Sequence, residues 1–342
     1  MASREVKIIA LAWAPFGHRL DELSSAVGGK RVNITLLYGP RYLAPIRYLA
    51  LFFRTLVLLW SESPDAVLAQ NPPIFCPVSA LLYCRFARKR LVVDHHSIWR
   101  LKTIGGGPVG RGIAFLERFV AKNSAANTAP HQVWADELEE MGGRRVLVIH
   151  DYVQKNPFQR DDEVKSKYAD GKVLAIASHG GHPLERIEVE VAAASRSDGL
   201  RLLVTGPPSK LAARLGDTPP NVRYLGLLPM DEYLRLKASC DFAVNITDEP
   251  ATLSHVLFEY AASSLPVIST ESDVVRETFG DALCYVKSSS ASDVAEALSE
   301  FLDDHRRRLE YAARMEAKFK KLTAARAREL ELLRTAISGR RP

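Results

Sequence analysis

Residues 241–270 read DFAVNITDEPATLSHVLFEYAASSLPVIST, and this stretch decides the fold class of the chain. The apolar runs at 241–246 and 265–269 each predict a buried parallel strand. Between them we expect a short helix after Ser254, because serine is a favoured N-cap and the apolar residues that follow fall on one side at helical spacing. Strand, helix and strand in this order are typical of a parallel α/β domain.

The start of this helix predicts a site for an anion. The first N–H groups of a helix have no partner within it, so those around Ser254 and His255 favour a negatively charged group such as a diphosphate. Glu259 follows about one turn later, where its carboxylate can accept two hydrogen bonds from the vicinal hydroxyls of a ribose. The alternative for Glu259 is a solvated helix carboxylate, which is a common role.

Composition bounds the class of protein. The length of 342 residues favours two domains, and 47% hydrophobic with 25% charged residues is ordinary for a soluble globular protein. The N-terminus runs directly into an apolar strand pattern, so we expect no signal peptide and a cytoplasmic location. The net charge of +6 comes without basic tracts interleaved with aromatics, so nucleic acid is not an expected partner. Four scattered cysteines indicate a reducing compartment and no zinc site: Cys76, Cys84, Cys240 and Cys284.

Strands and helices alternate over both halves of the chain, which predicts two Rossmann-like domains. A GxGxxG fingerprint is missing, so a dinucleotide cofactor is not expected. The C-terminal tail is expected to be helical and either to strap both domains together or to cap one of them. The predicted divisions are an N-terminal domain at 1–154, a polar linker at 155–171, a second domain at 172–290 and a helical tail at 291–342. The predicted strands are 6–12, 32–37, 65–69, 90–94, 126–129, 145–149, 173–177, 202–204, 222–226, 241–246, 265–269 and 282–286.

In the first half, several candidate site residues follow predicted strands, where α/β sheets bind ligands. Gly17 either lets a phosphate or sugar approach the backbone closely or makes a simple turn. Asp94 and His96 end another strand, and a histidine there can deprotonate a hydroxyl or bind a sugar. His95 and His96 should face opposite ways, so only one of them is expected at the site. Gly105–Gly107 is either a loop that closes over an acceptor or a plain connection.

In the second half, glycines and cations follow the predicted strands. Gly180 and Gly181 come after the strand at 173–177, and Gly206 comes after the strand at 202–204. Backbone N–H groups at such glycines can bind a diphosphate. Arg186 and His182 are the nearby side chains that we expect to meet charge on a leaving diphosphate.

The most apolar predicted helix, Pro45–Trp60, reads PIRYLALFFRTLVLLW. It is short for a membrane span and contains Arg47 and Arg54, so it is either a core helix that covers the sheet or an interfacial helix that rests on lipid. A basic cluster suits either an anionic membrane surface or a solvated helix end: Arg85, Arg88, Lys89 and Arg90.

Two α/β halves with a carboxylate-bearing helix in the second half resemble the GT-B fold of nucleotide-sugar glycosyltransferases, and the order of segments is similar to the family 4 type. In the first half the sequence resembles the chitobiosyldiphosphodolichol β-mannosyltransferases at Leu59-Trp60, Gln70–Pro73 (QNPP), Leu91–Asp94 and His96. In the second half the likeness covers Leu253–Glu259 and Leu265–Val267.

The resemblance implies two domains that face each other across a cleft and a metal-independent hexosyltransferase without a cofactor. It implies transfer of a sugar, with GDP-mannose as the first expectation, from a nucleotide diphosphate to a lipid-linked acceptor or polysaccharide precursor. The enzyme would work in the cytoplasm, peripherally at the membrane. The implied donor residues are Glu259, Ser254, His255, Gly180, Gly181, Arg186 and Gly206; Gly17 would face an acceptor or phosphate, and His96 or Asp94 would act on the acceptor hydroxyl.

Two other functions stay open on the sequence. A nucleotide-sugar epimerase would use the same architecture and no acceptor. A non-catalytic subunit that binds a nucleotide sugar is open because family 4 enzymes carry two glutamates eight positions apart, whereas Glu249 and Glu259 are ten apart and Val256 stands where a lysine is usual.

Overall fold

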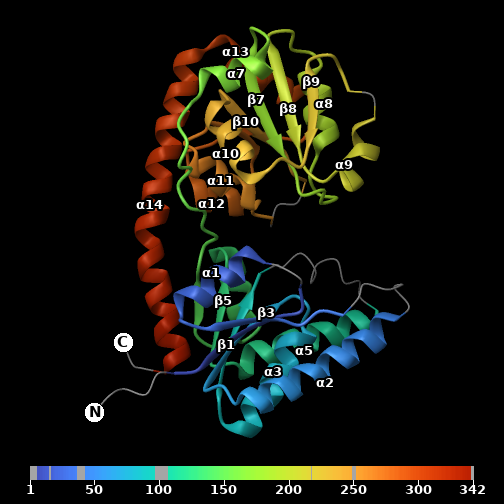
Figure 1. Ribbon diagram of the computed structural model, residues 1–342, viewed down its shortest axis with the longest axis vertical. Helices are drawn as coiled ribbons and strands as arrows, with labels where there is room; N and C mark the ends of the chain where they lie inside the picture. The colour runs from blue at the N-terminus through green and yellow to red at the C-terminus, as the bar shows by residue number, and fades with distance from the viewer. Residues whose placement is uncertain are drawn as a thin grey trace. The chain divides into compact units, whose positions relative to one another are not determined.

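The computed structural model describes residues 6–14, 17–36, 43–96, 107–216, 218–248 and 252–339. The chain forms two compact units: unit 1 is Met1–Asp151 with Ala324–Pro342, and unit 2 is Tyr152–Thr323. Each unit is built on a six-stranded parallel sheet with helices on both faces (Figure 1). The predicted α/β class, with two Rossmann-like halves and a long C-terminal helix, is confirmed.

The sheet of unit 1 has the strand order β2-β1-β3-β4-β5-β6. The second strand is shorter and earlier than the predicted 32–37, because it ends at Asn33, which pairs with Ala12, the last residue of β1. The strands are β1 (Ile8–Ala12), β2 (Lys30–Asn33), β3 (Ala66–Asn71), β4 (Arg90–His95), β5 (Ala126–Ala129) and β6 (Val146–Val148). The helices are α1 (His18–Ala26), α2 (Ala44–Glu62), α3 (Phe75–Ala87), α5 (Pro108–Asn123) and α6 (Gln132–Glu140).

Alternation along these strands builds two cores in unit 1. Ile9 and Leu11 of β1 belong to the cluster that includes side chains of α2 and α3. Their neighbours Ile8 and Ala10 belong to the opposite cluster, with Leu20 of α1. Both faces of the sheet are therefore covered, which explains why its strands read as continuous apolar runs.

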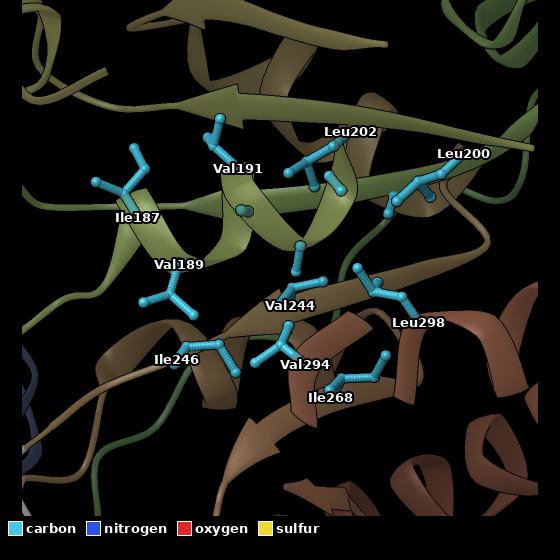
Figure 2. Close-up of a cluster of buried hydrophobic side chains, with 14 of the residues drawn as sticks. Ile187, Val189, Val191, Leu200, Leu202, Val244, Ile246, Ile268, Val294 and Leu298 are labelled. Atoms are coloured by element: carbon cyan, nitrogen blue, oxygen red, sulfur yellow. The ribbon is translucent and has the colours of Figure 1, made fainter. Parts of the chain in front are cut away.

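Unit 2 has the strand order β12-β11-β10-β7-β8-β9. The strands are β7 (Val173–Ser178), β8 (Leu200–Thr205), β9 (Val222–Gly226), β10 (Phe242–Asn245), β11 (Val267–Thr270) and β12 (Cys284–Val286). The helices are α7 (Asp162–Ala169), α8 (Ile187–Ala194), α9 (Pro208–Leu215), α10 (Met230–Ser239), α11 (His255–Ala262), α12 (Asp273–Phe279) and α13 (Ala291–Asp303). Figure 2 shows one of its cores, to which α8, β10 and α13 contribute Val189, Val244 and Val294.

The stretch predicted as a linker contains helix α7. Asp161 is its N-cap, and the carboxylate accepts hydrogen bonds from the backbone N–H groups of Glu163 at 2.9 Å and Val164 at 3.2 Å. The acidic residues Asp161, Asp162 and Glu163 are thus the start of a helix, where an aspartate N-cap is favoured. The units divide earlier, between Asp151 and Tyr152. Helix α9 was not predicted at all.

The predicted helical tail consists of two helices. Helix α13 ends at Asp303, Asp304 interrupts the helical conformation, and α14 covers His305–Ser338. Met315 and Phe319, in the first part of α14, pack in a core of unit 2. Leu333 and Ile337, in its last part, pack against the sheet of unit 1. One helix thus supplies core side chains to each unit, and its predicted role as a strap stays a prediction.

Replacing Leu333 with alanine should destabilise unit 1 by about 2–5 kcal/mol, because its side chain is fully buried and its loss leaves a cavity. All four tryptophans, Trp13, Trp60, Trp99 and Trp134, lie in the part of the sequence assigned to unit 1, so urea unfolding followed by tryptophan fluorescence reports this unit. Leu332→Ala is the matched control, since Leu332 is 38% exposed and should cost far less. Equal midpoints for the two variants would contradict the packing of α14 described above.

Candidate active site

Each sheet has a switch point, which is the place where the order of strands along the chain changes direction. In open α/β sheets, ligands bind at this point, beyond the carboxyl ends of the strands. In unit 2 it lies between the neighbouring strands β7 and β10, because the chain runs from β7 through β8 to β9 on one side and returns to β10 on the other. In unit 1 it lies between β1 and β3. The predicted donor residues gather in unit 2, and the predicted acceptor residues gather in unit 1.

Glu259 of α11 is held by two side chains of α10. Its Oε2 accepts hydrogen bonds from the Tyr233 hydroxyl and the Lys237 ammonium, both at 2.8 Å. Lys237 is almost completely buried, and this burial lowers its pKa although the Glu259 carboxylate opposes the shift. Glu259 Oε1 accepts no hydrogen bond from the part of the chain that the structure describes. A half-exposed carboxylate with one oxygen fixed and the other available suits a polar ligand.

Lys237 and Tyr233 are functional candidates that sequence reasoning missed. They are four positions apart, so they lie on one face of α10. The resemblance led us to look for a lysine at Val256, on the same helix as Glu259. The cation beside Glu259 is instead Lys237 of the neighbouring helix α10. The one signal of this in the sequence is that Lys237 stands next to the apolar Leu236, at a position where burial is expected.

Helix α11 begins at the predicted place, with Ser254 as its N-cap residue, but the Ser254 side chain makes no capping hydrogen bond. His255 is the first residue of the helix and is exposed, with its ring 6.4 Å from that of Phe258. The structure therefore brings Ser254, His255 and Glu259 together on the predicted helix. Glu249, the other glutamate of the resemblance, lies outside the described residues.

The loop after β7 has the geometry of an anion site, but a carboxylate of the protein occupies it. The N–H groups of Gly180, Gly181 and His182 donate to Glu185 at 2.9, 2.8 and 2.8 Å. Gly181 has a positive φ of 76°, which orients successive N–H groups toward one point. The predicted N–H donors are thus present, and Glu185 is the anion that they bind in this structure.

Behind this loop lies His179, a buried histidine between two carboxylates. Its Nε2 is 2.7 Å from Glu190 Oε2, and its Nδ1 is 3.6 Å from Glu185 Oε2. Burial alone would lower the pKa of His179, but the two carboxylates raise it to about 10. Glu190 Oε1 also accepts the N–H of Ile246 at 2.8 Å, so this cluster joins the end of β7 to the end of β10.

The remaining donor candidates of unit 2 have structural partners. Arg186 forms an ion pair with Asp248. Gly206 leaves no room for a side chain, because a Cβ there would lie 2.4 Å from the carbonyl oxygen of His179. Lys210 of α9 is exposed, and its Nζ lies 3.3 Å from the carbonyl oxygen of Gly180. This lysine is a further cation beside the loop, and it was missed because α9 was missed.

In unit 1, Asp94 is completely buried, and its predicted role toward an acceptor stays a prediction. Its carboxylate accepts from Arg19 Nε at 3.0 and 3.1 Å and from the Thr128 hydroxyl at 2.6 Å. Arg19 also pairs with Asp151 at 2.8 Å and donates to the carbonyl of Ile149. Asp94 is therefore a positioning residue that fixes the end of β4 against α1.

His96 is exposed and His95 is buried, so the two neighbours face different surroundings as alternation predicts. His95 contacts Asn71 at 3.2 Å and Asn127 at 3.0 Å, and burial lowers its pKa to about 4. Asn71 also donates to Glu117 of α5 at 2.7 Å, and burial raises the pKa of Glu117 to about 7. His96 is the histidine that can meet a ligand, and its role as a base stays a prediction.

Gly17 precedes α1, and a Cβ there would make ordinary contact with Gln70 at 3.6 Å. Packing within the described residues therefore does not demand glycine at this position. Nearby, at the ends of β1 and β3, a cavity of about 230 Å³ is lined by Trp13, Arg47, Pro72 and others. Gly105 and Gly106 of the predicted loop lie outside the described residues. Within the described ranges, no three His, Cys, Asp or Glu side chains gather as metal ligands would.

The free energy of unfolding should fall as the pH rises from about 6.5 to about 10, because the folded state keeps a proton on His179 that the unfolded state loses near pH 6.5. This stabilisation is complete below pH 6.5 and disappears as the pH passes the folded pKa. The slope from this one group should approach roughly 1.4 kcal/mol per pH unit.

Calorimetric unfolding of the wild type and of His179→Gln between pH 6 and 10 measures this slope. The difference between the two curves isolates His179 from the other groups that titrate. Parallel curves would show that the pKa of His179 is not raised in the folded protein.

Family models match both halves of the chain. Residues 1–151 match the glycosyl transferase 4-like domain, and residues 186–333 match a second model described as glycosyl transferase-like. A search of curated protein sequences finds no match.

Solved structures share the fold over nearly the whole chain. Anabaena Alr3699/HepE in complex with UDP and glucose has a TM-score of 0.76 at 15% identity, covering 96% of this chain and 99% of that one. Sucrose-phosphate synthase from Thermosynechococcus elongatus has a TM-score of 0.78 at 15% identity, covering 97% and 100%. A glycosyltransferase from Rickettsia africae has a TM-score of 0.68 at 12% identity, covering 98% and 99%. The chain therefore belongs to the glycosyltransferases of GT-B fold, with one glycosyltransferase domain in each half.

Proposed function

We propose that the protein transfers a sugar from a nucleotide diphosphate donor to a lipid-linked acceptor. The observation that carries the donor part is Glu259, whose carboxylate is fixed through one oxygen by Lys237 and Tyr233 beside the switch point of unit 2. The other oxygen and the exposed edge of the carboxylate suit the vicinal hydroxyls of a ribose.

Two kinds of nucleotide sugar are candidates for the donor. The HepE structures hold UDP, UDP with glucose, and UDP-glucose, which supports a uridine nucleotide. The mannosyltransferase resemblance of the first half favours GDP-mannose. In either case, charge on the diphosphate would be met by the N-terminus of α11 and by a cation such as Lys210, without a metal ion.

The proposed reaction is a displacement at the anomeric carbon of the donor sugar. The acceptor hydroxyl gives its proton to His96, and its oxygen forms a bond to the anomeric carbon. The bond between that carbon and the phosphate oxygen breaks, and the nucleoside diphosphate leaves with the electron pair. In this proposal Asp94 positions the end of β4 and does not contact the acceptor, because its buried carboxylate already accepts hydrogen bonds from Arg19 and Thr128.

The proposed acceptor is lipid-linked because α2 is apolar and largely exposed. Among the described residues, α2 is the one helix whose length and composition would allow it to cross a membrane. Its buried residues Leu51, Thr55 and Leu59 pack it onto unit 1, which supports an interfacial helix. We place the protein peripherally at the cytoplasmic face of a membrane.

One observation favours a second candidate, a non-catalytic protein that binds a nucleotide sugar. Glu185 accepts the hydrogen bonds of the Gly180 and Gly181 N–H groups, which would otherwise suit a diphosphate. Binding of a donor without transfer to any acceptor, and without release of free sugar, would favour this candidate.

Replacing Glu259 with glutamine should weaken nucleotide binding about tenfold or more, because the ribose hydroxyls would no longer donate to a charged carboxylate. Lys237→Met should also weaken it, since Glu259 loses its fixed orientation. Arg235→Met is the control, because it removes the same charge from an exposed position on the same helix. Titration calorimetry with UDP, UDP-glucose, GDP and GDP-mannose measures these affinities and selects the donor. Equal affinities for all four proteins would place the nucleotide away from Glu259.

Replacing His96 with alanine should lower the transfer rate by roughly 10²- to 10⁴-fold, which is the usual contribution of a general base. Nucleotide affinity should stay unchanged, because no donor contact is assigned to His96. The measurement is release of nucleoside diphosphate in the presence of a prenyl-linked sugar acceptor. Undiminished release would remove His96 from the mechanism.

A further inference from the structure

Helix α2 has an apolar stripe on the side opposite its buried residues. Ile46, Leu49, Phe53, Val57 and Trp60 recur at helical spacing, and each is more than half exposed. Contiguous apolar surface of this kind marks a binding site for a protein, a membrane or an apolar ligand.

Helices α3 and α5 of unit 1 also expose apolar side chains: α3 packs against both α2 and α5, and residues of α2 and α5 line one groove (Figure 1). Phe86 of α3 and Val109, Phe115 and Phe119 of α5 are also exposed. We call this surface, formed by the exposed apolar side chains of α2, α3 and α5, the apolar face.

Within the apolar face, a groove of about 780 Å³ lies between α2 and α5. This volume falls within the range of small-molecule sites in proteins. Among the described residues that line the groove, none is charged, so a hydrocarbon chain suits it. Its lining residues include Leu49 and Phe52 of α2, Phe75 of α3, and Gly112, Ile113 and Leu116 of α5.

The groove leads to the carboxyl end of the sheet. Tyr48 lines the groove and also lines the cavity at the ends of β1 and β3. Arg47, the preceding residue, lines that cavity but not the groove. An amphiphile with its chain in the groove would therefore have its head beside a guanidinium group, at the edge of the sheet where His96 follows β4.

The charges on these helices match an anionic amphiphile. Glu62 and Glu117 are the acidic residues within Ala44–Glu62, Phe75–Ala87 and Pro108–Asn123. Glu62 pairs with Lys7 and Lys30, and Glu117 is buried. The same three ranges carry six basic residues: Arg47, Arg54, Arg85, Arg111, Arg118 and Lys122.

We propose that the groove between α2 and α5 binds the hydrocarbon chain of a lipid phosphate, with the phosphate beside Arg47. This inference deepens the proposed function and rests on it for the identity of the lipid as the acceptor. The groove selects a chain by its apolar lining, and Arg47 in the adjoining cavity selects a negatively charged head.

Farnesyl phosphate, used below its micellar concentration, tests the groove by titration calorimetry with the full chain. Gly112→Leu should weaken binding at least tenfold, because the new side chain fills the groove. A Cβ at Gly112 meets no atom within 4 Å, so the variant should fold, and loss of a helical glycine should even stabilise α5. Gly199→Leu, at an equally open position in unit 2, is the matched control and should bind like the wild type.

Two further ligands and one further variant complete the test. Farnesol should bind more weakly than farnesyl phosphate, inorganic phosphate alone should bind more weakly still, and Arg47→Gln should reduce the difference between farnesyl phosphate and farnesol. Equal binding of farnesyl phosphate to wild type and Gly112→Leu overturns the proposal, as does a loss of binding in Phe53→Ser but not in Gly112→Leu.

The nucleotide titration with Glu259→Gln, made on the same preparations, separates the two proposals. Nucleotide binding that depends on Glu259, together with no binding of farnesyl phosphate, overturns only the lipid groove. Farnesyl phosphate binding that depends on Gly112, without any nucleotide binding, overturns the proposed nucleotide donor but supports the proposed lipid groove.

Discussion

A buried cation lies between two carboxylates at the carboxyl edge of each sheet. The positions of the candidate site residues in both units depend on this arrangement. In unit 1 the cation is Arg19, with Asp94 and Asp151. In unit 2 it is His179, with Glu185 and Glu190. Removing one partner of such a group leaves an uncompensated buried charge, which typically costs about 3–5 kcal/mol. Each cluster therefore fixes several strand ends and loops at once, at the edge where parallel sheets bind ligands.

These buried clusters determine which neighbouring groups can meet a ligand. Because β4 is anchored through Asp94 and His95, the next residue, His96, is the first exposed side chain at its end. His179 is buried directly after β7, and the two glycines that follow it donate their N–H groups to Glu185. In both units, reactive or binding groups come directly after a residue that the core holds in place.

The sequence predicts those features that depend on local pattern. Apolar runs located the strands, and the capping residue with its apolar spacing located α11 and placed Glu259 on it. Features that depend on tertiary contacts were not predictable. The burial of Asp94 requires Arg19 and Thr128, which are distant in the sequence, and the fixation of Glu259 requires Lys237 of another helix. The bounds of β2 were missed because its pairing with β1, rather than local propensity, sets where it ends.

Glu185 connects the buried cluster of unit 2 to ligand binding. Its carboxylate accepts three backbone N–H groups and lies near His179, and its pKa is lowered because these interactions outweigh burial, which acts in the opposite direction. A diphosphate that used the same N–H groups would have to displace a carboxylate that is ionised and well bound. His179 would keep Glu190 as its partner in that event, so displacement would not leave a buried cation unpaired. The loop after β7 is thus built to hold one anion, and a ligand that binds there competes directly with Glu185.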